Sequence, residues 1–303
     1  MNSNKIKYIY SDLDETIVPK VSKETCRYGK YTFNDLLEIS ERNQKAIKTC
    51  QDLALGFGIA TGRSYQKTYP IIQKLKIDIP VVCLDGAQIY LKNKLLLSEC
   101  LHPGLIYSFN KIINRNQDVP FFLISDYTTY LSETDDWMTA EEEMYLEKEL
   151  FPENDFLYSV RLNPETTWDL PFEKVNTILI MIEKMTWQMQ KEIELLCNQF
   201  DAHFIRYNRV IQILPLNVSK VSALKYISQY LLKGMSPFNT AVFGDNKNDI
   251  EMLKWSHWGV AMENGHLTAK ECAKYICRDV NEDGVALWIE KNILNKTTKG
   301  ENN

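Results

Sequence analysis

The sequence contains no apolar run near the roughly 20 residues that a membrane-spanning helix needs. Its first residues carry no apolar segment of the signal-peptide kind, so we expect neither a membrane span nor a secretion signal. The net charge is −5, and no basic footprint of the kind that binds nucleic acid is evident. We therefore expect no membrane or nucleic-acid partner, and local positive groups must attract any anionic substrate.

Cysteine pairs of the metal-binding kind are also missing. The seven cysteines are an odd number, include no CxxC pair and lie mostly beside apolar residues. The sequence has only four histidines, and we predict no zinc site at them. Cysteine usage of this kind is typical of a cytoplasmic protein whose thiols stay reduced and buried.

What is present is the composition of an ordinary globular protein, with 45% hydrophobic and 25% charged residues. At 303 residues, the chain is long enough for two domains or one large domain. In its N-terminal part, apolar runs at residues 6–10, 59–60 and 79–84 alternate with helical patterns that end near Leu55 and Lys76. This alternation predicts a parallel, doubly wound sheet.

Two local features of this part are testable. In the first helix, Ile47, Cys50 and Ala54 are expected to share one apolar face. Before the second strand, Gly56-Phe57-Gly58 is expected to interrupt regular structure, which leaves only Ile59 and Ala60 for that strand.

The middle of the chain shows a different pattern, with several strands and fewer helices. One amphipathic helix is expected, and its apolar face carries Ile193, Leu196, Cys197 and Phe200. The expected strands cover residues 121–124, 177–182, 204–207 and 210–214, with Asn208-Arg209 as a candidate hairpin turn. This pattern favours an α+β module with an antiparallel sheet. An acidic, aromatic stretch, Asp126–Glu149, is expected to form helix and loop at its surface.

The strand–helix alternation resumes at Lys220. A helix is expected there, followed by a strand at 241–243, a helix from about Asn248 to Trp255, and a strand at 259–262. The polar tail, Lys296–Asn303, is expected to be disordered.

The predicted fold class is therefore α/β, with a doubly wound, Rossmann-like core and an inserted α+β domain. We predict that residues 1–87 and 212–303 form the core, and that residues 88–211 form the insertion.

Acidic side chains follow two of the predicted core strands directly. Asp12 and Asp14 end the first strand, and Asp245 and Asp249 follow the strand at 241–243. Open α/β sheets bind their ligands at the carboxyl ends of the strands, so these carboxylates are expected to converge. Carboxylates that converge repel one another unless a cation lies between them. We read a magnesium-dependent phosphoryl-transfer site.

Each group in this set has a plausible chemical role. Asp12 can attack phosphorus and form an aspartyl phosphate, and Asp14 can protonate the leaving alcohol and later activate water. The Thr61 hydroxyl and the Gly62 N–H suit phosphate oxygens. Lys220, at a helix start, supplies a fixed positive charge.

The acidic residues after the second strand suit the cation. Asp245 can bind magnesium directly, and Asp249 can approach Asp245 if a helix starts between them. A lone Asp-x-Asp or Thr-Gly-Arg is weak evidence, because such residues are common in turns and loops. Together and in order, the segments make a purely structural role improbable.

The sequence resembles the haloacid dehalogenase (HAD) superfamily, on four motifs in their usual order. These are Asp12-Leu13-Asp14-Glu15-Thr16, Thr61-Gly62-Arg63, Lys220 and Gly244-Asp245-Asn246-Lys247-Asn248-Asp249. Asp85-Gly86-Ala87, Asn217-Val218-Ser219-Lys220, Val260-Ala261-Met262-Glu263-Asn264 and Glu282-Asp283-Gly284-Val285 resemble its Cof-type phosphatase branch. The insertion takes the place of that branch's α/β cap, which defines subclass IIB.

The resemblance implies a role for each matching residue. Asp12 would be the nucleophile and Asp14 the general acid/base, while Thr61 and Lys220 would hold the phosphate. Mg²⁺ would be bound by Asp12, the backbone carbonyl of Asp14 and Asp245, with Asn248 and Asp249 in support. Members of this family mostly hydrolyse small phosphate esters, often sugar phosphates.

Three features depart from the family pattern. Glu15 replaces a common glycine, at a position that varies in the family. Asp85 replaces an asparagine, and its charge could alter substrate polarity or simply lie in a turn. The stretch Pro19–Ser40 is longer than usual, and could cover the site entrance or only decorate the surface.

Two classes of function stay open at this point. Among enzymes, a phosphatase acting on a small phosphate ester is the leading hypothesis. A phosphomutase or phosphotransferase would use the same aspartyl phosphate. In the other class, the protein would be a non-catalytic, regulatory member that carries a phosphorylatable aspartate. The sequence does not determine the substrate or the oligomeric state.

Overall fold

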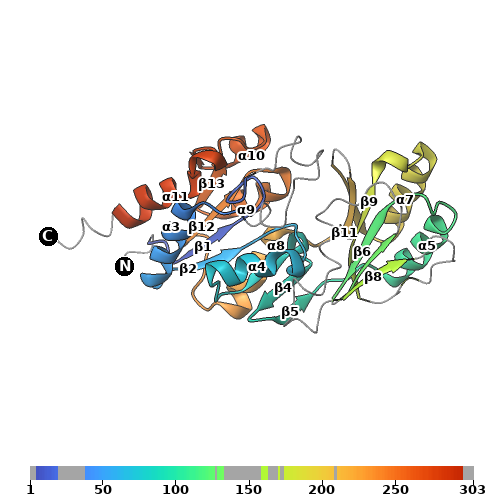
Figure 1. Cartoon of the computed structure of the whole chain (residues 1–303), viewed down its shortest axis with the longest axis horizontal. Coiled ribbons are helices and arrows are strands. Elements are labelled where there is room, and N and C mark those ends of the chain that lie inside the picture. The colour runs from blue at the N-terminus through green and yellow to red at the C-terminus, as the bar shows by residue number, and fades with distance from the viewer. Residues whose placement is uncertain are drawn as a thin grey trace. The chain divides into compact units, whose positions relative to one another are not determined.

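The computed structural model describes residues 5–19, 38–126, 128–132, 158–162, 170, 174–207 and 210–295 (Figure 1). The predictions for the tail, for the Asn208-Arg209 turn and for most of the stretches 19–40 and 126–149 lie outside these residues. The chain divides into two compact units. Of the described residues, those at 5–19, 38–96 and 219–295 form the first unit, and those between 97 and 218 form the second.

A five-stranded sheet forms the centre of the first unit (Figure 1). In spatial order its strands are β14 (Tyr275–Cys277), β13 (Trp258–Met262), β12 (Thr240–Gly244), β1 (Tyr8–Ser11) and β2 (Gly56–Ile59). Every neighbouring pair is parallel. The predicted parallel α/β sheet is confirmed, and β1 lies between β12 and β2.

The start of β2 differs from the prediction. Gly56 and Gly58 lie inside the strand rather than before it, paired with Tyr8 and Tyr10 of β1. A Cβ at Gly58 would lie 2.5 Å from the Tyr10 ring. These glycines therefore make room for two tyrosine side chains, a close approach that leaves no sign in the strand pattern of the sequence.

A smaller sheet continues from the end of β2. A parallel bridge joins Ala60 to Val82 in β3 (Val81–Cys83), and β4 (Gln88–Leu91) pairs antiparallel with β3. The third strand, β5 (Lys94–Ser98), follows a turn in which Lys92 and Asn93 both have positive φ. Lys-Asn is not the usual Asn-Gly signal of such a turn, and the sequence analysis missed this hairpin.

The helices of the first unit follow the predicted alternation. They are α3 (Glu41–Asp52), α4 (Tyr65–Leu75), α8 (Lys220–Tyr226) with the π-helical turn η4 (Ile227–Leu231), the 3-10 turn η5 (Lys247–Asp249) with α9 (Ile250–Trp255), α10 (Leu267–Cys272), and α11 (Gly284–Ile289) with η7 (Glu290–Leu294). In α3, Ile47 and Cys50 are buried as predicted. Ala54 is exposed, because it lies beyond the helix end with φ of 58°.

In its described residues, the second unit consists of a six-stranded sheet, the helices α5 (Pro103–Ile113) and α7 (Trp187–Gln199) and the 3-10 turn η3 (Ile182–Lys184). The strand order is β10 (Ala202–Arg206), β11 (Val210–Pro215), β9 (Val175–Met181), β6 (Phe121–Ser125), β7 (Thr128–Ser132) and β8 (Tyr158–Leu162). Adjacent strands are antiparallel except β7 and β8, which are parallel. The α+β prediction is confirmed, although β8 was not predicted and β7 lies within the stretch 126–149, for which the prediction of helix and loop is wrong at residues 128–132.

Helices α5 and α7 supply apolar side chains to the core of this unit. In α7, Ile193, Leu196 and Cys197 are buried as predicted, and Phe200 packs against the core at the helix end. Helix α5 was missed because Pro103-Gly104 resembles a helix breaker. Proline is in fact well suited to the first position of a helix, where its missing N–H has no partner to lose.

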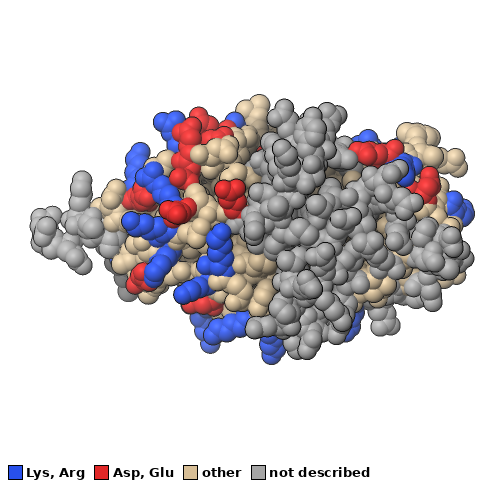
Figure 2. Space-filling view, in the orientation of Figure 1, with Lys and Arg blue, Asp and Glu red and all other residues tan. Residues whose placement is uncertain are grey.

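Charges are mixed over the surface of the first unit. On the face that Figure 2 shows, acidic and basic residues are interspersed among the described residues. Within the described part of the chain, no helix is both long enough and apolar enough to cross a bilayer.

Candidate active site

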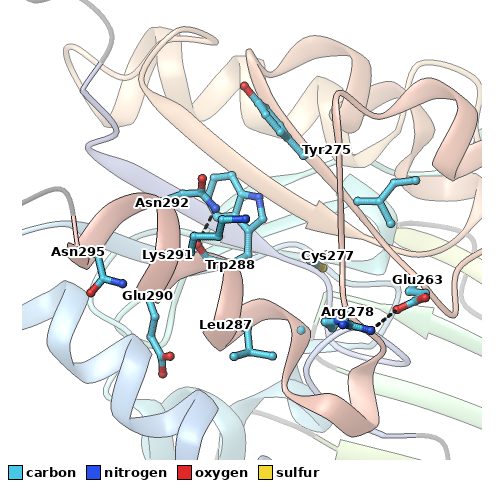
Figure 3. Close-up of a pocket in the computed structure, with 12 residues that line it drawn as sticks. Glu263, Tyr275, Cys277, Arg278, Leu287, Trp288, Glu290, Lys291, Asn292 and Asn295 are labelled. Carbon is cyan, nitrogen blue, oxygen red and sulfur yellow. Dashed lines mark hydrogen bonds and ion pairs between the residues drawn. The ribbon is translucent and has the colours of Figure 1, made fainter.

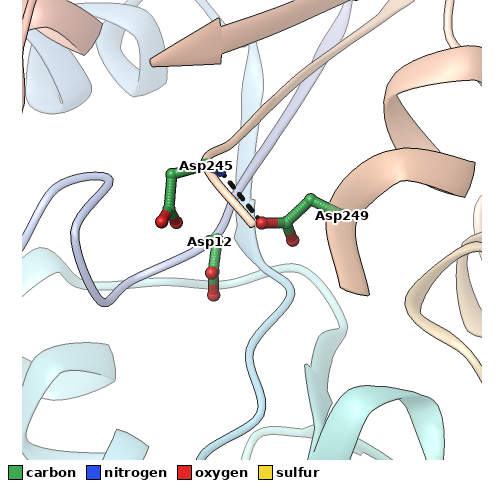
Figure 4. Close-up of side chains that lie close together, drawn as sticks. All are labelled: Asp12, Asp245 and Asp249. Carbon is green, nitrogen blue, oxygen red and sulfur yellow. Dashed lines mark hydrogen bonds between the residues drawn. The ribbon is translucent and has the colours of Figure 1, made fainter. Parts of the chain in front are cut away.

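Three carboxylates meet at the carboxyl ends of β1 and β12. Ser11 pairs with Phe243 in the two parallel strands, and the Asp12 N–H donates to the Phe243 carbonyl at 3.0 Å. Asp12 and Asp245, which directly follow these strands, are thereby placed side by side. One oxygen each of Asp12, Asp245 and Asp249 lies within 4.8 Å of the others, as Figure 4 illustrates. All three residues are buried.

Asp249 has a structural role within this group. Its Oδ2 accepts the backbone N–H groups of Asp245 and Asn246 at 3.0 and 2.9 Å. Its Oδ1 accepts the Lys220 ammonium at 2.7 Å. Because both of its oxygens are engaged, Asp249 orients the loop that carries Asp245.

Lys220 lies between the acidic groups. Its Nζ is 2.9 Å from Asp12 Oδ1 and 2.7 Å from Asp249 Oδ1, and the residue is 1% exposed. It is the first residue of α8, as predicted. Ser219 caps that helix, and the two residues Ser219 and Ser222 exchange side-chain and backbone hydrogen bonds. The cap fixes the helix start, and with it the root of the Lys220 side chain.

Burial and mutual repulsion change the pKa values of these groups. Burial raises the pKa of Asp12 well above its usual range, although Lys220 opposes this shift. Burial, reinforced by Asp249, raises the pKa of Asp245 to about 7. Burial lowers the pKa of Lys220, but Asp12, Asp249 and Asp85 outweigh it and raise the pKa overall. The site therefore carries more carboxylates than Lys220 can neutralise.

Asp14 lies in a different environment. Its side chain is 56% exposed and forms a two-pronged ion pair with Arg63, whose side chain is 8% exposed. Arg63 Nε donates to Asp14 Oδ2 at 2.9 Å, and Nη2 donates to Oδ1 at 2.5 Å. Desolvation raises the pKa of Asp14, but the guanidinium holds it below its usual value.

The predicted phosphate-binding loop follows β2. Thr61 is buried, and its hydroxyl accepts the Arg63 N–H at 3.1 Å. A Cβ at Gly62 would lie 3.1 Å from Asp85 Oδ2, so a larger residue would crowd this carboxylate. The loop thus lies against Asp85.

Asp85 is part of the site rather than an isolated turn residue. It is buried, and its Oδ1 accepts the Asn248 amide at 2.8 Å. Its φ of 53° is a conformation that aspartate tolerates better than most residues. Asn248 is therefore oriented by the residue that departs from the family pattern.

Sequence analysis missed several contacts in this region. The Thr16 hydroxyl donates to Asp245 Oδ1 at 3.1 Å. The Asn264 amide donates to the Glu15 carbonyl at 2.8 Å, and its oxygen accepts the Val280 N–H at 3.0 Å. Glu15 has φ of 57°, which explains why glycine is common there. Thr16 and Asn264 lie within recognised motifs, but the motifs do not reveal their partners.

The donor set fits a hard divalent cation. The groups that converge are carboxylate oxygens, and burial, with repulsion from Asp249, raises the pKa values of Asp12 and Asp245 above their ordinary range. Mg²⁺ and similar ions prefer oxygen ligands and favour the ionised form of such groups.

A separate cavity of about 720 Å³ lies along β14 and α11 (Figure 3). Tyr275, Arg278 and Trp288 are among the residues that line it. Arg278 Nη1 lies 4.0 Å from Glu263 Oε2. Among the described residues that line it, none belongs to the predicted catalytic, phosphate-binding or metal-binding set. We therefore place the candidate active site at the acidic cluster.

Comparison with known proteins identifies similar chains. The family described as haloacid dehalogenase-like hydrolase matches residues 9–289. A Mycoplasma pneumoniae protein that carries a phosphatase name is 32% identical over 291 residues, which are 96% of this chain and 99% of the relative. A Bacillus subtilis 5-amino-6-(5-phospho-D-ribitylamino)uracil phosphatase is 26% identical, over 95% and 96% of the two chains.

A solved structure has the same fold as this chain. It belongs to a HAD subclass IIB sugar phosphatase and superposes with a TM-score of 0.66 at 19% identity. The superposition covers 94% of this chain and 98% of that one.

Proposed function

This chain belongs to the haloacid dehalogenase-like hydrolase family, and from that premise we propose that it is a Mg²⁺-dependent phosphatase. Its substrate is a small phosphate monoester, of the sugar-phosphate type or a related phosphometabolite, and its intermediate is an aspartyl phosphate. The observation that carries this proposal is the convergence of Asp12, Asp245 and Asp249 around the buried Lys220.

In the first half of the reaction, an Asp12 carboxylate oxygen attacks phosphorus and the bond to the leaving alcohol breaks. Asp14 must first take up a proton, because its ion pair with Arg63 keeps it ionised in the free protein, and the alcohol oxygen then takes that proton. In the second half, Asp14 accepts a proton from water, the water oxygen attacks phosphorus, and the bond to Asp12 breaks. Inorganic phosphate leaves, and both aspartates return to their starting state.

Fixed charges and donors suit the phosphoryl group. Lys220 is held rigidly beside Asp12 by two ion pairs, so its positive charge needs little reorganisation during the reaction. We assign the Thr61 hydroxyl and the Gly62 N–H to the phosphate oxygens.

Asp12, Asp245 and the backbone carbonyl of Asp14 would hold Mg²⁺, with Asn248 and Asp249 in support. The ion would neutralise charge on the phosphate oxygens when bound. Asp249 supports the site by fixing the Asp245 loop, and Asp85 by orienting Asn248.

We assign substrate choice to the second unit, because it is the part inserted into the chain of the first unit, which carries the proposed catalytic residues. The relatives support a small phosphometabolite. The Bacillus subtilis relative is named for a phosphorylated ribityl compound, and the solved subclass IIB structure is named as a sugar phosphatase.

The test is hydrolysis of p-nitrophenyl phosphate by the purified protein with Mg²⁺, together with a panel of sugar, nucleotide and cofactor phosphates. We expect wild type to release inorganic phosphate, and Asp12→Asn to reduce the rate to background. Release of phosphate separates a phosphatase from a phosphomutase. Background turnover by wild type across the panel would contradict the proposal.

A further inference from the structure

The mechanism above assigns no step of the reaction to the two-pronged ion pair between Arg63 and Asp14, which we call the fork. The two residues are 49 positions apart, and two different guanidinium nitrogens reach the two carboxylate oxygens. A planar two-pronged pair fixes the orientation of a carboxylate as well as its position.

The base of the Arg63 side chain is held firmly. The Arg63 N–H donates to the Thr61 hydroxyl at 3.1 Å, and its carbonyl accepts the Leu84 N–H at 3.0 Å. Ser64, the next residue, caps α4 by accepting the Lys67 N–H. The guanidinium therefore extends from a backbone that is tied to the end of β3 and to a helix start.

The backbone that carries Asp14 is held as well. The Leu13 carbonyl accepts the N–H groups of Thr16, Ile17 and Val18 at 2.9 to 3.1 Å. The Glu15 carbonyl is held by the Asn264 amide. What these contacts leave free is the rotation of the Asp14 side chain, which is more than half exposed. Ordering such a side chain costs conformational entropy unless a partner holds it.

We propose that Arg63 is the positioning residue for Asp14, and that its fork aims the Asp14 carboxyl group at the leaving-group oxygen. This inference rests on the proposed phosphatase function and on Asp14 as its acid/base. Each carboxylate oxygen has two lone pairs, so the fork leaves one on each oxygen for the transferred proton. Arg63 acts through Asp14 and exchanges no proton itself.

A positioning role has a kinetic signature that a general structural role lacks. Proton donation matters most when the leaving alcohol is a poor leaving group, and little when it leaves readily as an anion. Loss of Arg63 should therefore harm alkyl phosphates far more than p-nitrophenyl phosphate. The value of kcat/KM is the right measure, because it reports the step in which the alcohol departs.

The experiment compares wild type, Arg63→Ala and Arg63→Lys with Mg²⁺ on p-nitrophenyl phosphate and on an alkyl phosphate that wild type hydrolyses. General acid catalysis contributes about 10²- to 10⁴-fold, so we expect Arg63→Ala to lose at least about tenfold more kcat/KM on the alkyl phosphate than on the aryl phosphate. Lysine keeps the charge but not the fork, and should give an intermediate ratio.

Arg42 offers a matched control. Its guanidinium forms the same kind of fork with Glu290, through Nε at 3.0 Å and Nη2 at 2.7 Å, and it is more exposed than Arg63. Arg42→Ala removes an equivalent ion pair from the same unit, but we expect equal kcat/KM changes on both substrates. Melting temperatures of all variants separate folding defects from kinetic ones.

Equal losses by Arg63→Ala on both substrates would overturn the inference, as would a rise in KM alone, which would make Arg63 a phosphate ligand. If the alanine variant does not fold, Arg63→Lys is measured in its place, and an unchanged substrate ratio overturns the inference. Inactivity of wild type on every ester would instead remove the proposed function on which the inference rests.

Discussion

Lys220 stabilises the site by balancing two buried carboxylates. Asp12 and Asp249 both lie within 3 Å of its ammonium, and all three side chains are almost inaccessible to water. Removing one partner from a buried ion pair leaves charge that neither water nor protein compensates. The residue therefore contributes to folding as well as to the proposed chemistry.

Replacing Lys220 should destabilise the protein strongly. We expect Lys220→Met to lower the free energy of unfolding by about 3–5 kcal/mol, as measured by urea titration with EDTA present. The matched control is Lys48→Met, because Lys48 pairs with Asp52 at 3.1 Å on the exposed face of α3. That exposed pair should contribute no more than about 0.5 kcal/mol. Similar losses for the two variants would contradict the account.

At the residue scale, the motifs located the acidic groups and Lys220, and the structure brings Asp12, Asp245, Asp249 and Lys220 together. The Arg63–Asp14 fork could not be predicted in the same way. It depends on the distance between the β1 turn and the start of α4, which only the folded backbone sets. Tertiary packing also sets the position of Asp85 against Gly62, so the sequence could not predict this contact.

At the scale of elements, the site is built from strand ends and one helix start. The parallel register of β1 and β12 places Asp12 beside Asp245, and α8 begins at Lys220. The Ser219 cap determines where that helix begins. A change in the cap should therefore affect both stability and activity.

Ser219→Ala tests this connection. Loss of an N-cap costs about 1 kcal/mol, and we expect that loss together with a lower kcat on p-nitrophenyl phosphate. Thr186→Ala is the control, because Thr186 caps α7 in the second unit through a 3.1 Å bond to the Met189 N–H. The control should lose similar stability and keep its kcat. Equal kcat values for the two variants would show that the cap does not act through Lys220.

Periodicity predicted α7, whose faces differ clearly, and continuous apolar runs predicted the central parallel strands, which are buried on both faces. It failed where another signal competed. The glycines of β2 resemble a break but accommodate Tyr8 and Tyr10, and the proline of α5 occupies a position that helices favour. The turn at Lys92-Asn93 has no glycine to mark it.

At the scale of the whole molecule, the family resemblance seen in the motifs is confirmed by the match over residues 9–289. The largest sheets of the two units differ in type, because that of the first is parallel and that of the second is mainly antiparallel. The boundary between the units falls at residue 97, near the end of β5, so β4 and most of β5 belong to the first unit. The four superfamily motifs, at residues 12–16, 61–63, 220 and 244–249, all lie in the first unit.

Cation binding should couple to pH through the stability of the whole protein. The folded pKa of Asp245 is about 7, above its ordinary value of 3.8. Between these values the cation-free folded state binds more protons than the unfolded state, so its stability falls as pH rises through this window. A cation favours the ionised carboxylates and should offset that fall.

The measurement is the rise in melting temperature that Mg²⁺ causes relative to EDTA. We expect this rise to be small near about pH 5, to grow with pH and to level off above about pH 7, where Asp245 is ionised. Asp245→Asn should remove most of the rise at every pH. A Mg²⁺ effect of the same size across the whole range would contradict the link between cation and proton.

The central claim is that Asp12 carries the phosphoryl group, and borohydride trapping tests it most directly. Borohydride reduces an acyl phosphate to an alcohol, so an aspartyl phosphate trapped during turnover becomes homoserine, which mass spectrometry of the peptide locates. The account predicts homoserine at position 12 in wild type with substrate and Mg²⁺, and unchanged aspartate without substrate. Steady release of phosphate with Asp12 never modified, or with the modification at another aspartate, would contradict it.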